Sequence, residues 1–170
     1  MGSSKANRRR FIAGIGAAIA VSGAAGPVAA LTPVMPCPTD RVTITGGFGA
    51  AAFNVDVAAD EETRARGLMH VESMPLSKGM LFVYQRPQRM SFWMRNTLIE
   101  LDMLFLDGFG VIRHIHHRAQ PLDETPISGG DDLLLGVLEI NGGLASRLGI
   151  QAGDVLRHPA FVSLSDPWNC

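Results

Sequence analysis

The densest group of polar and aromatic side chains in the sequence lies between residues 93 and 102. Trp93, Asn96 and Asp102 belong to this group, and Arg66 and Glu139 are further polar side chains that folding could bring to it. Trp offers a flat apolar face, and the amide, carboxylate and guanidinium groups form directional hydrogen bonds. This combination indicates a binding site for a small carbohydrate- or peptide-like ligand. Asn and Asp are also common turn residues that bond to nearby backbone, and that interpretation stays open.

Two histidines, His114 and His116, form a second group. If they lie on one strand they share a face, about 6–7 Å apart, where a metal ion such as zinc or copper could bind them. A third ligand, Glu139 or Asp102, would have to come from a neighbouring strand. The alternative is a solvated strand face without metal. We therefore expect no obligatory cofactor and keep a metal as an option.

Methionine is frequent between residues 69 and 103, where six of these side chains occur. Thioethers bind copper(I), but most of these positions fall on apolar runs, where filling of the core is the ordinary role of Met. These residues keep open a metal-binding function without favouring it over packing.

Signs of catalysis are few in this sequence. No Ser stands in a G-x-S-x-G setting, and neither Cys has the surroundings of a nucleophile. A pair of carboxylates could be drawn from Glu100, Asp102 and Glu139, although the sequence does not give their separation. We expect a binding or accessory module rather than an enzyme, with a metal-dependent or carboxylate-based hydrolase as the alternative.

Composition limits the class of protein. The chain has 170 residues, of which 46% are hydrophobic and 18% charged, with two Cys and a formal charge of -1. It is too apolar to be disordered, too short for two ordinary domains and too poor in Cys for a disulfide scaffold. A nucleic-acid binder would carry a basic surplus, so we expect no nucleic-acid partner.

The first thirty residues have the pattern of an export signal. Four basic residues precede the apolar run FIAGIGAAIAVSGAAG, and small residues lead up to Ala30. The run is shorter than the roughly 20 apolar residues of a spanning helix, so cleavage near Ala30 is expected and no membrane span would remain, with an uncleaved anchor as the alternative. The segment RRRFI is similar to a twin-arginine pattern, which directs folded proteins across the membrane, but Asn7 stands where Ser or Thr is usual, and a signal of the general export pathway is the alternative. We expect a periplasmic or secreted protein, with a small molecule or a cell-envelope component as its partner.

Removal of residues 1–30 changes the charge and the meaning of the cysteines. Four of the 15 basic residues leave with the leader, so 11 stand against 16 acidic residues and the remaining chain is near -5. Cys37 and Cys170 then lie near the two ends of an exported domain, where an oxidising compartment permits a disulfide. The alternative is that both cysteines remain unpaired thiols.

The remaining chain is expected to form an extended arm over residues 31–40, rich in Pro, and one domain over residues 41–170. A helix should follow Asp60 and end at Gly67, and a second should follow Asn141 and end at Gly149. The turn at 107–110 should join two antiparallel strands. Apolar or alternating runs predict strands at 41–45, 51–59, 80–84, 90–94, 101–107, 111–117 and 133–140, with one or two more in the tail. Since neither helix is long enough to cross between parallel strands, we expect a mainly β fold, an antiparallel barrel or sandwich with two short helices, with α+β as the alternative.

Several segments together resemble the DUF192 family, also known as UPF0127. They are RGLM (66–69), GMLFV (79–83), FWMRNTLIELDMLFLD (92–107), GVI (110–112), VLEINGG (137–143) and GIQAGD (149–154). The resemblance implies a single small, mainly β domain, often exported or membrane-attached, with no established activity. The family usually reads NTLIPLD, and here Glu100 replaces the Pro, which removes a backbone restriction and adds a carboxylate.

Overall fold

The computed structural model describes residues 38–161. The expected leader, most of the arm, Cys37 and Cys170 lie outside these residues. The helices are α1 (Glu61–Arg66) and α2 (Leu144–Leu148). The strands are β1 (Arg41–Gly46), β2 (Gly49–Ala58), β3 (Lys78–Gln88), β4 (Ser91–Phe92), β5 (Leu101–Leu106), β6 (Ile112–Ala119), β7 (Ile127–Ser128), β8 (Leu134–Asn141) and β9 (Val155–Arg157). The mainly β class with two short helices is confirmed.

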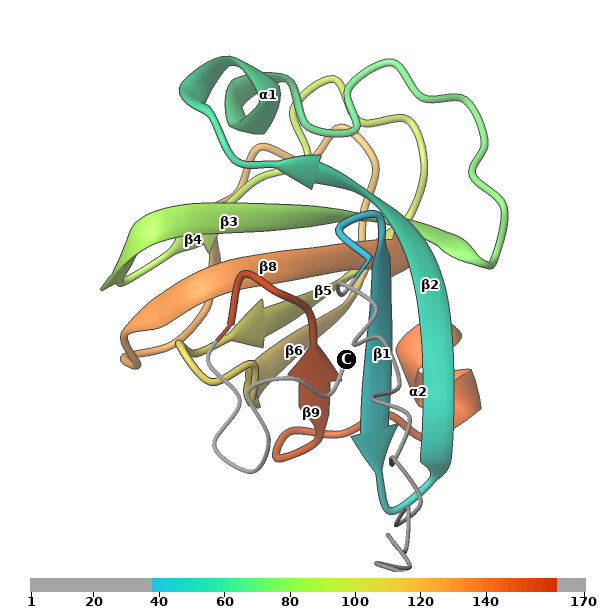
Figure 1. The fold of residues 1–170 in the computed structure, drawn as a ribbon. Coiled ribbons are helices and arrows are strands. Elements are labelled where there is room, and N and C mark those ends of the chain that lie inside the picture. Colours follow the sequence, from blue (N-terminus) through green and yellow to red (C-terminus); the bar gives the residue numbers. More distant parts are fainter. Residues whose placement is uncertain (1–37, 162–170) are drawn as a thin grey trace, which may run out of the picture. The chain divides into compact units, whose positions relative to one another are not determined.

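Seven strands form one curled sheet in the order β6-β5-β8-β3-β2-β1-β9, and β4 pairs with β7 in a separate ribbon (Figure 1). The curl brings the beginning of β6 to β9, where Val111 and Val155 form an antiparallel bridge. The backbone N–H groups of Ile112 and Leu156 donate to the carbonyls of Asp154 and Gly110 at the same point. The sheet therefore curls as a half-barrel whose two edge strands meet at one point.

One strand pair differs from the antiparallel expectation, because β2 and β3 run parallel. The helix α1 alone is indeed too short to cross between them. The crossover is instead residues 59–77, in which α1 is followed by a long irregular segment. The expectation of antiparallel strands alone was wrong for this pair, because an irregular segment can also carry the chain back along the sheet.

Each face of the sheet carries its own apolar core. Strand β5 shows this directly, since Leu104 and Leu106 belong to one core and Met103 and Phe105 to the other. All six residues of β5 are buried. The first core includes residues of α2, and the second is covered by irregular segments that contain residues such as Leu68, Met90 and Met94. These covering segments also position the candidate site.

Two local predictions need correction, and one short strand was not predicted. The strand expected at 90–94 ends at Phe92, because Met94 turns inward and its N–H donates to the carbonyl of Asp123. The cap of α2 is Gly143 and not Asn141, which ends β8 and donates to the carbonyls of Met74 and Pro75. The short strand β7 had no periodic signal.

Three other expectations on local structure are confirmed. Asp60 caps α1 through the N–H of Thr63, and Gly67 ends this helix at a φ of 48°. The turn at 107–110 joins β5 and β6, and the Asp107 carboxylate accepts the N–H groups of Phe109 and Val111. The turn is thus held by its first side chain.

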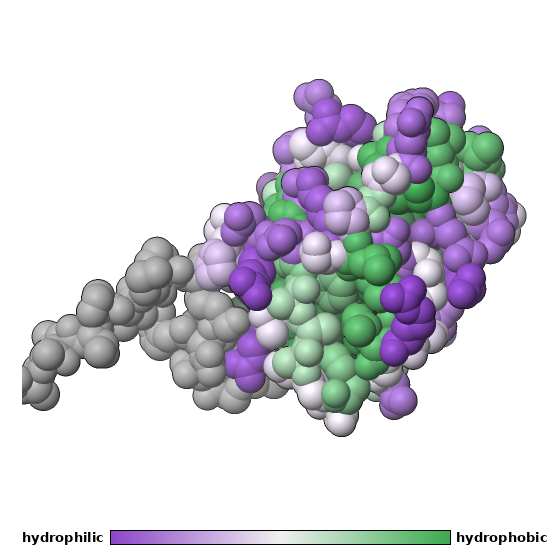
Figure 2. All heavy atoms as spheres, turned by 90° about the vertical axis from the view of Figure 1, so that its right-hand side faces the viewer, coloured by the Kyte–Doolittle hydropathy of each residue, from purple (hydrophilic) through white to green (hydrophobic). Residues whose placement is uncertain are grey.

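Figure 2 views the side of β2 and α2 and shows an apolar area between polar margins. Val57 of β2 and Leu148 of α2 are among the exposed large apolar residues. Within residues 38–161, neither helix has the length and apolar character that crossing a bilayer requires.

Candidate binding cleft

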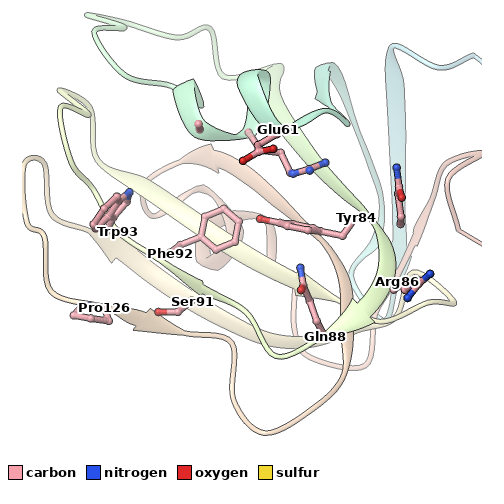
Figure 3. Close-up of a pocket in the computed structure, with 11 residues that line it drawn as sticks. Glu61, Tyr84, Arg86, Gln88, Ser91, Phe92, Trp93 and Pro126 are labelled. Atoms are coloured by element: carbon pink, nitrogen blue, oxygen red, sulfur yellow. The ribbon is translucent and has the colours of Figure 1, made fainter.

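A cleft of about 850 Å³ opens between α1, the carboxyl end of β3 and the strand β4 (Figure 3). Its volume is within the roughly 300–1,000 Å³ of small-molecule sites. The lining residues come from four places in the sequence: Glu61, Arg64 and Ala65; Tyr84, Gln85, Arg86 and Gln88; Ser91, Phe92 and Trp93; and Pro126.

The cleft exists because β3 continues beyond the point where its pairing with β2 ends. Pairing of β2 with β3 ends at Ala58 and Phe82, after which the chain turns into α1. The guanidinium of Arg64 donates to the carbonyls of Ala59 and Val83 and so fastens α1 to the emerging strand. The residues of β3 beyond Val83 therefore form one wall of a cleft, and α1 forms another.

Three aromatic side chains dominate the interior of the cleft, and Figure 3 shows Phe92 between Trp93 and Tyr84. The Phe92 ring packs edge to face on Phe82 and Phe105, with centroids 5.2 and 6.0 Å apart. Trp93 remains 50% exposed, and the Arg95 guanidinium lies 5.7 Å from its ring centroid. The aromatic wall thus combines an anchored Phe with an accessible Trp.

Charged groups surround this wall. The Arg64 guanidinium lies 4.7 Å from the ring centroid of Tyr84. Burial raises the pKa of the Tyr84 hydroxyl, Arg64 opposes the rise and Glu139 adds to it. Tyr84 therefore offers a neutral hydroxyl at ordinary pH, and Glu61 and Arg86 add one carboxylate and one exposed guanidinium to the lining.

Of the five residues predicted for a ligand site, the structure places Trp93 in the cleft. Arg66 ends α1 outside the lining set. Asn96 stands in a turn at a φ of 52°, and its amide contacts the sulfur of Met69 at 3.9 Å. The structure does not bring Arg66 or Asn96 to Trp93 in this cleft.

Asp102 bonds to backbone groups of the fold and does not line the cleft. Its carboxylate is fully buried and accepts the backbone N–H groups of Arg118, Gly143 and Ala145 at 2.8–2.9 Å. It therefore holds the beginning of α2 and the end of β6 to β5. The Nδ1 of His117 lies 3.8 Å from the same carboxylate.

Glu139 is buried on the other face of the sheet, opposite Met80 of β3 and Met103 of β5. Burial raises the pKa of its carboxyl to about 8. Asp102 pairs with Ile140, so neighbouring positions place the Asp102 and Glu139 side chains on opposite faces. These two carboxylates cannot act on one substrate together.

Glu100, the third carboxylate considered for hydrolysis and the residue that replaces the family's Pro, lies at the entrance to β5. Its carboxylate accepts bonds from Arg118 at 3.0 Å and Gln120 at 3.2 Å. Its side chain is therefore used in joining the entrance of β5 to the end of β6.

His114 and His116 do share a face of β6, since they pair with Phe105 and Met103 of β5. Asp102 faces the opposite side, and Glu139 lies on β8, two strand spacings or roughly 9–10 Å from β6. Within residues 38–161, no three His, Cys, Asp or Glu side chains stand close enough together to hold a metal ion. The structure therefore does not unite the predicted ligands.

The methionines lie mainly in the second core. Met80, Met90, Met94 and Met103 are buried there, and Met74 packs against it. This arrangement is what core filling requires.

Sequence reasoning missed most of the cleft. Tyr84 ends the apolar run of β3 and Arg86 follows it, and Glu61 and Arg64 lie in the segment predicted only to form the first helix. The single Tyr of the chain beside the polar segment QRPQ was a usable signal for a strand that leaves the core. Nothing local in the sequence shows that α1 lies over that strand.

Comparison with known proteins gives a family and two structures. The family model DUF192, described as "Uncharacterized ACR", matches residues 42–158. A protein of unknown function from Novosphingobium aromaticivorans is 41% identical, with a TM-score of 0.67, over 69% of this chain and 83% of that chain. A "putative transcription regulator" from Sinorhizobium meliloti is 34% identical, with a TM-score of 0.69, over 75% and 98%. No curated protein matches the chain.

Proposed function

Since the chain belongs to the DUF192 family, which is described without an activity, we propose a function from the site itself. We propose that this protein is an exported binding or accessory module whose cleft holds a small carbohydrate- or peptide-like ligand. The observation that carries the proposal is the accessible Trp93 beside Phe92 and Tyr84 in a cleft of ligand size. Apolar surface with a few convergent polar groups is the usual composition of such sites.

A nucleic-acid partner is not part of this proposal, although one structural relative is described as a "putative transcription regulator". Residues 38–161 hold 11 basic and 15 acidic side chains, a balance of -4. A protein with this balance repels phosphate backbones unless it has a strong basic patch. A small molecule or a component of the cell envelope is the partner we propose.

Substitution of Trp93 tests the binding site. In a thermal-shift screen of mono- and disaccharides and dipeptides, we expect at least one compound to raise the melting temperature of the wild type. Trp93→Ala should require about tenfold more ligand for the same rise in melting temperature. The reason is that an aromatic contact in a site contributes on the order of 1 kcal/mol or more.

Phe109→Ala is the matched control, because Phe109 is an exposed aromatic residue in the turn before β6 and outside the cleft. It should keep the full response. Equal ligand responses in Trp93→Ala and the wild type would remove the cleft as the binding site.

Export is the second part of the proposal. It is supported by the basic residues, apolar run and small residues of the first thirty positions. After expression of the full chain in a bacterium with both export pathways, N-terminal sequencing of the periplasmic protein should begin at or near Leu31. Replacement of Arg8, Arg9 and Arg10 by Lys should block export if the twin-arginine route is used. Uncleaved protein confined to the cytoplasm contradicts this part.

A further inference from the structure

We propose that the ligand of the cleft is a saccharide bearing a carboxylate, and that Arg86 binds this carboxylate. The inference rests on the proposed function, since it names the chemical class that the same cleft accepts. Three observations support it: the charge of the cleft lining, the contacts that Arg64 and Arg86 already make, and the backbone groups of β3 that are available for pairing.

The charge of the lining is opposite to that of the domain. Two cations, Arg64 and Arg86, stand against one anion, Glu61, and Arg95 adds a third cation against the ring of Trp93. The described residues as a whole have a balance of -4. A local excess of positive charge in an otherwise acidic domain raises the local concentration of anions at the cleft.

The two arginines in the lining differ in the contacts that they make within the protein. Arg64 already donates to the carbonyls of Ala59 and Val83 and lies over the Tyr84 ring. Arg86 is exposed, and among residues 38–161 it has no hydrogen bond, ion pair or ring contact. Figure 3 shows Arg86 at the edge of the cleft, on the side of Tyr84 away from Trp93. Of the two arginines in the lining, it is the one whose guanidinium can bind a carboxylate there, at the far end of a ligand that lies on Trp93, in the bidentate geometry that Arg favours.

The strand edge in the cleft argues against a peptide that adds to the sheet. Such a peptide needs free backbone groups along β3 beyond the last residue paired with β2, Phe82. The Val83 carbonyl is occupied by Arg64, and Pro87 has no N–H to donate. Main-chain pairing is thus blocked at two positions of this short edge.

Side chains provide the remaining recognition, and they suit a sugar. Gln85, Gln88 and the carboxylate of Glu61 offer planar donors and acceptors for hydroxyl groups. The half-exposed ring of Trp93 offers an apolar face on which a sugar ring can lie. With Arg86 as the anion-binding group, the cleft fits an acidic sugar better than a neutral one.

Calorimetric titration of the purified full-length chain with trigalacturonate and with its neutral trimethyl ester tests the inference. The two probes share their rings and hydroxyl groups and differ in charge. We expect the acid to bind about tenfold or more tightly than the ester, as one charge-assisted bidentate contact requires. Arg86→Gln should remove this difference by weakening the acid alone.

The control variant is Arg89→Gln, which removes the same charge three residues away, where Arg89 is largely exposed and lies 3.7 Å from Asp131. It should leave both affinities within about twofold, because exposed pairs outside the cleft contribute little. Triglutamate serves as an anionic peptide and should bind more weakly than trigalacturonate.

The outcomes separate the inference from the proposed function. Equal binding of acid and ester that is lost in Trp93→Ala overturns the anionic specificity and leaves the binding function standing. Tighter binding of triglutamate, or equal effects of Arg86→Gln and Arg89→Gln, also overturns the inference. If none of the three probes binds while a neutral sugar or dipeptide binds at Trp93, the inference fails; if nothing binds there, both fail.

Discussion

Asp102→Ala is expected to destabilise the domain by about 4 kcal/mol in chemical denaturation, because three backbone N–H groups, two of them in buried hydrogen bonds, lose their carboxylate acceptor at once. The donors are Arg118, Gly143 and Ala145, which lie on β6 and at the beginning of α2. The loss should therefore appear as a lower denaturation midpoint together with faster hydrogen exchange in α2.

Asp56→Ala is the control for this effect. The Asp56 carboxylate bonds to Lys78 at 2.8 Å, but both side chains are substantially exposed. We expect a loss of less than about 1 kcal/mol there, as for most exposed ion pairs. If Asp102→Ala costs no more than Asp56→Ala, Asp102 does not hold α2 to the sheet.

The second large effect concerns Glu139, whose burial raises the pKa of its carboxyl from 4.5 to about 8. The folded state thus holds a proton that the unfolded state releases near pH 4.5. Below that value the group imposes no penalty, and the stability of the wild type falls as the pH rises, until the fall levels off above pH 8. At about 1.4 kcal/mol per pH unit, the full loss of unfolding free energy between these two pKa values approaches roughly 5 kcal/mol.

Glu139→Gln keeps the shape of the side chain without the proton equilibrium. We expect it to match the wild type near pH 5 and to exceed it by several kcal/mol at pH 9, in urea denaturation followed across this range. Since other groups titrate alike in both proteins, the difference between the two curves isolates Glu139. Glu62→Gln, on the exposed face of α1, should follow the wild type throughout. Parallel curves for Glu139→Gln and the wild type would show that the pKa of Glu139 is not raised.

Much of the fold was readable from local signals. The cap of α1, the stop at Gly67 and the turn after β5 depend on side chains within a few residues of the backbone that they bond. The parallel pair β2 and β3 was missed, because its partners are separated by an irregular crossover without periodicity. The cap of α2 was also missed, since its acceptor, Asp102, lies about forty residues before the helix.

The candidate site was less predictable for a related reason. The sequence indicated Trp93 because an aromatic residue in a polar segment is visible locally. It could not show that Tyr84 would lie against Arg64 of α1, or that Arg86 would line the same cleft, because this depends on where β2 stops pairing with β3. For Asn96 and Asp102 the residue types fit a ligand site and a turn equally well, and only their partners distinguish the two roles.

The place of β8 in the sheet has a consequence for the order of events during synthesis. Before residues 134–141 are made, the chain can pair β1, β2 and β3 with one another, and β5 with β6, as two separate halves. Strand β8 joins them within the sheet, because it lies between β3 and β5, and the bridge between Val111 and Val155 at β9 follows later. If export uses the twin-arginine route, which carries folded proteins, the sheet can be complete for transport only after β8 and β9 have been synthesised, since domains form as their strands leave the ribosome.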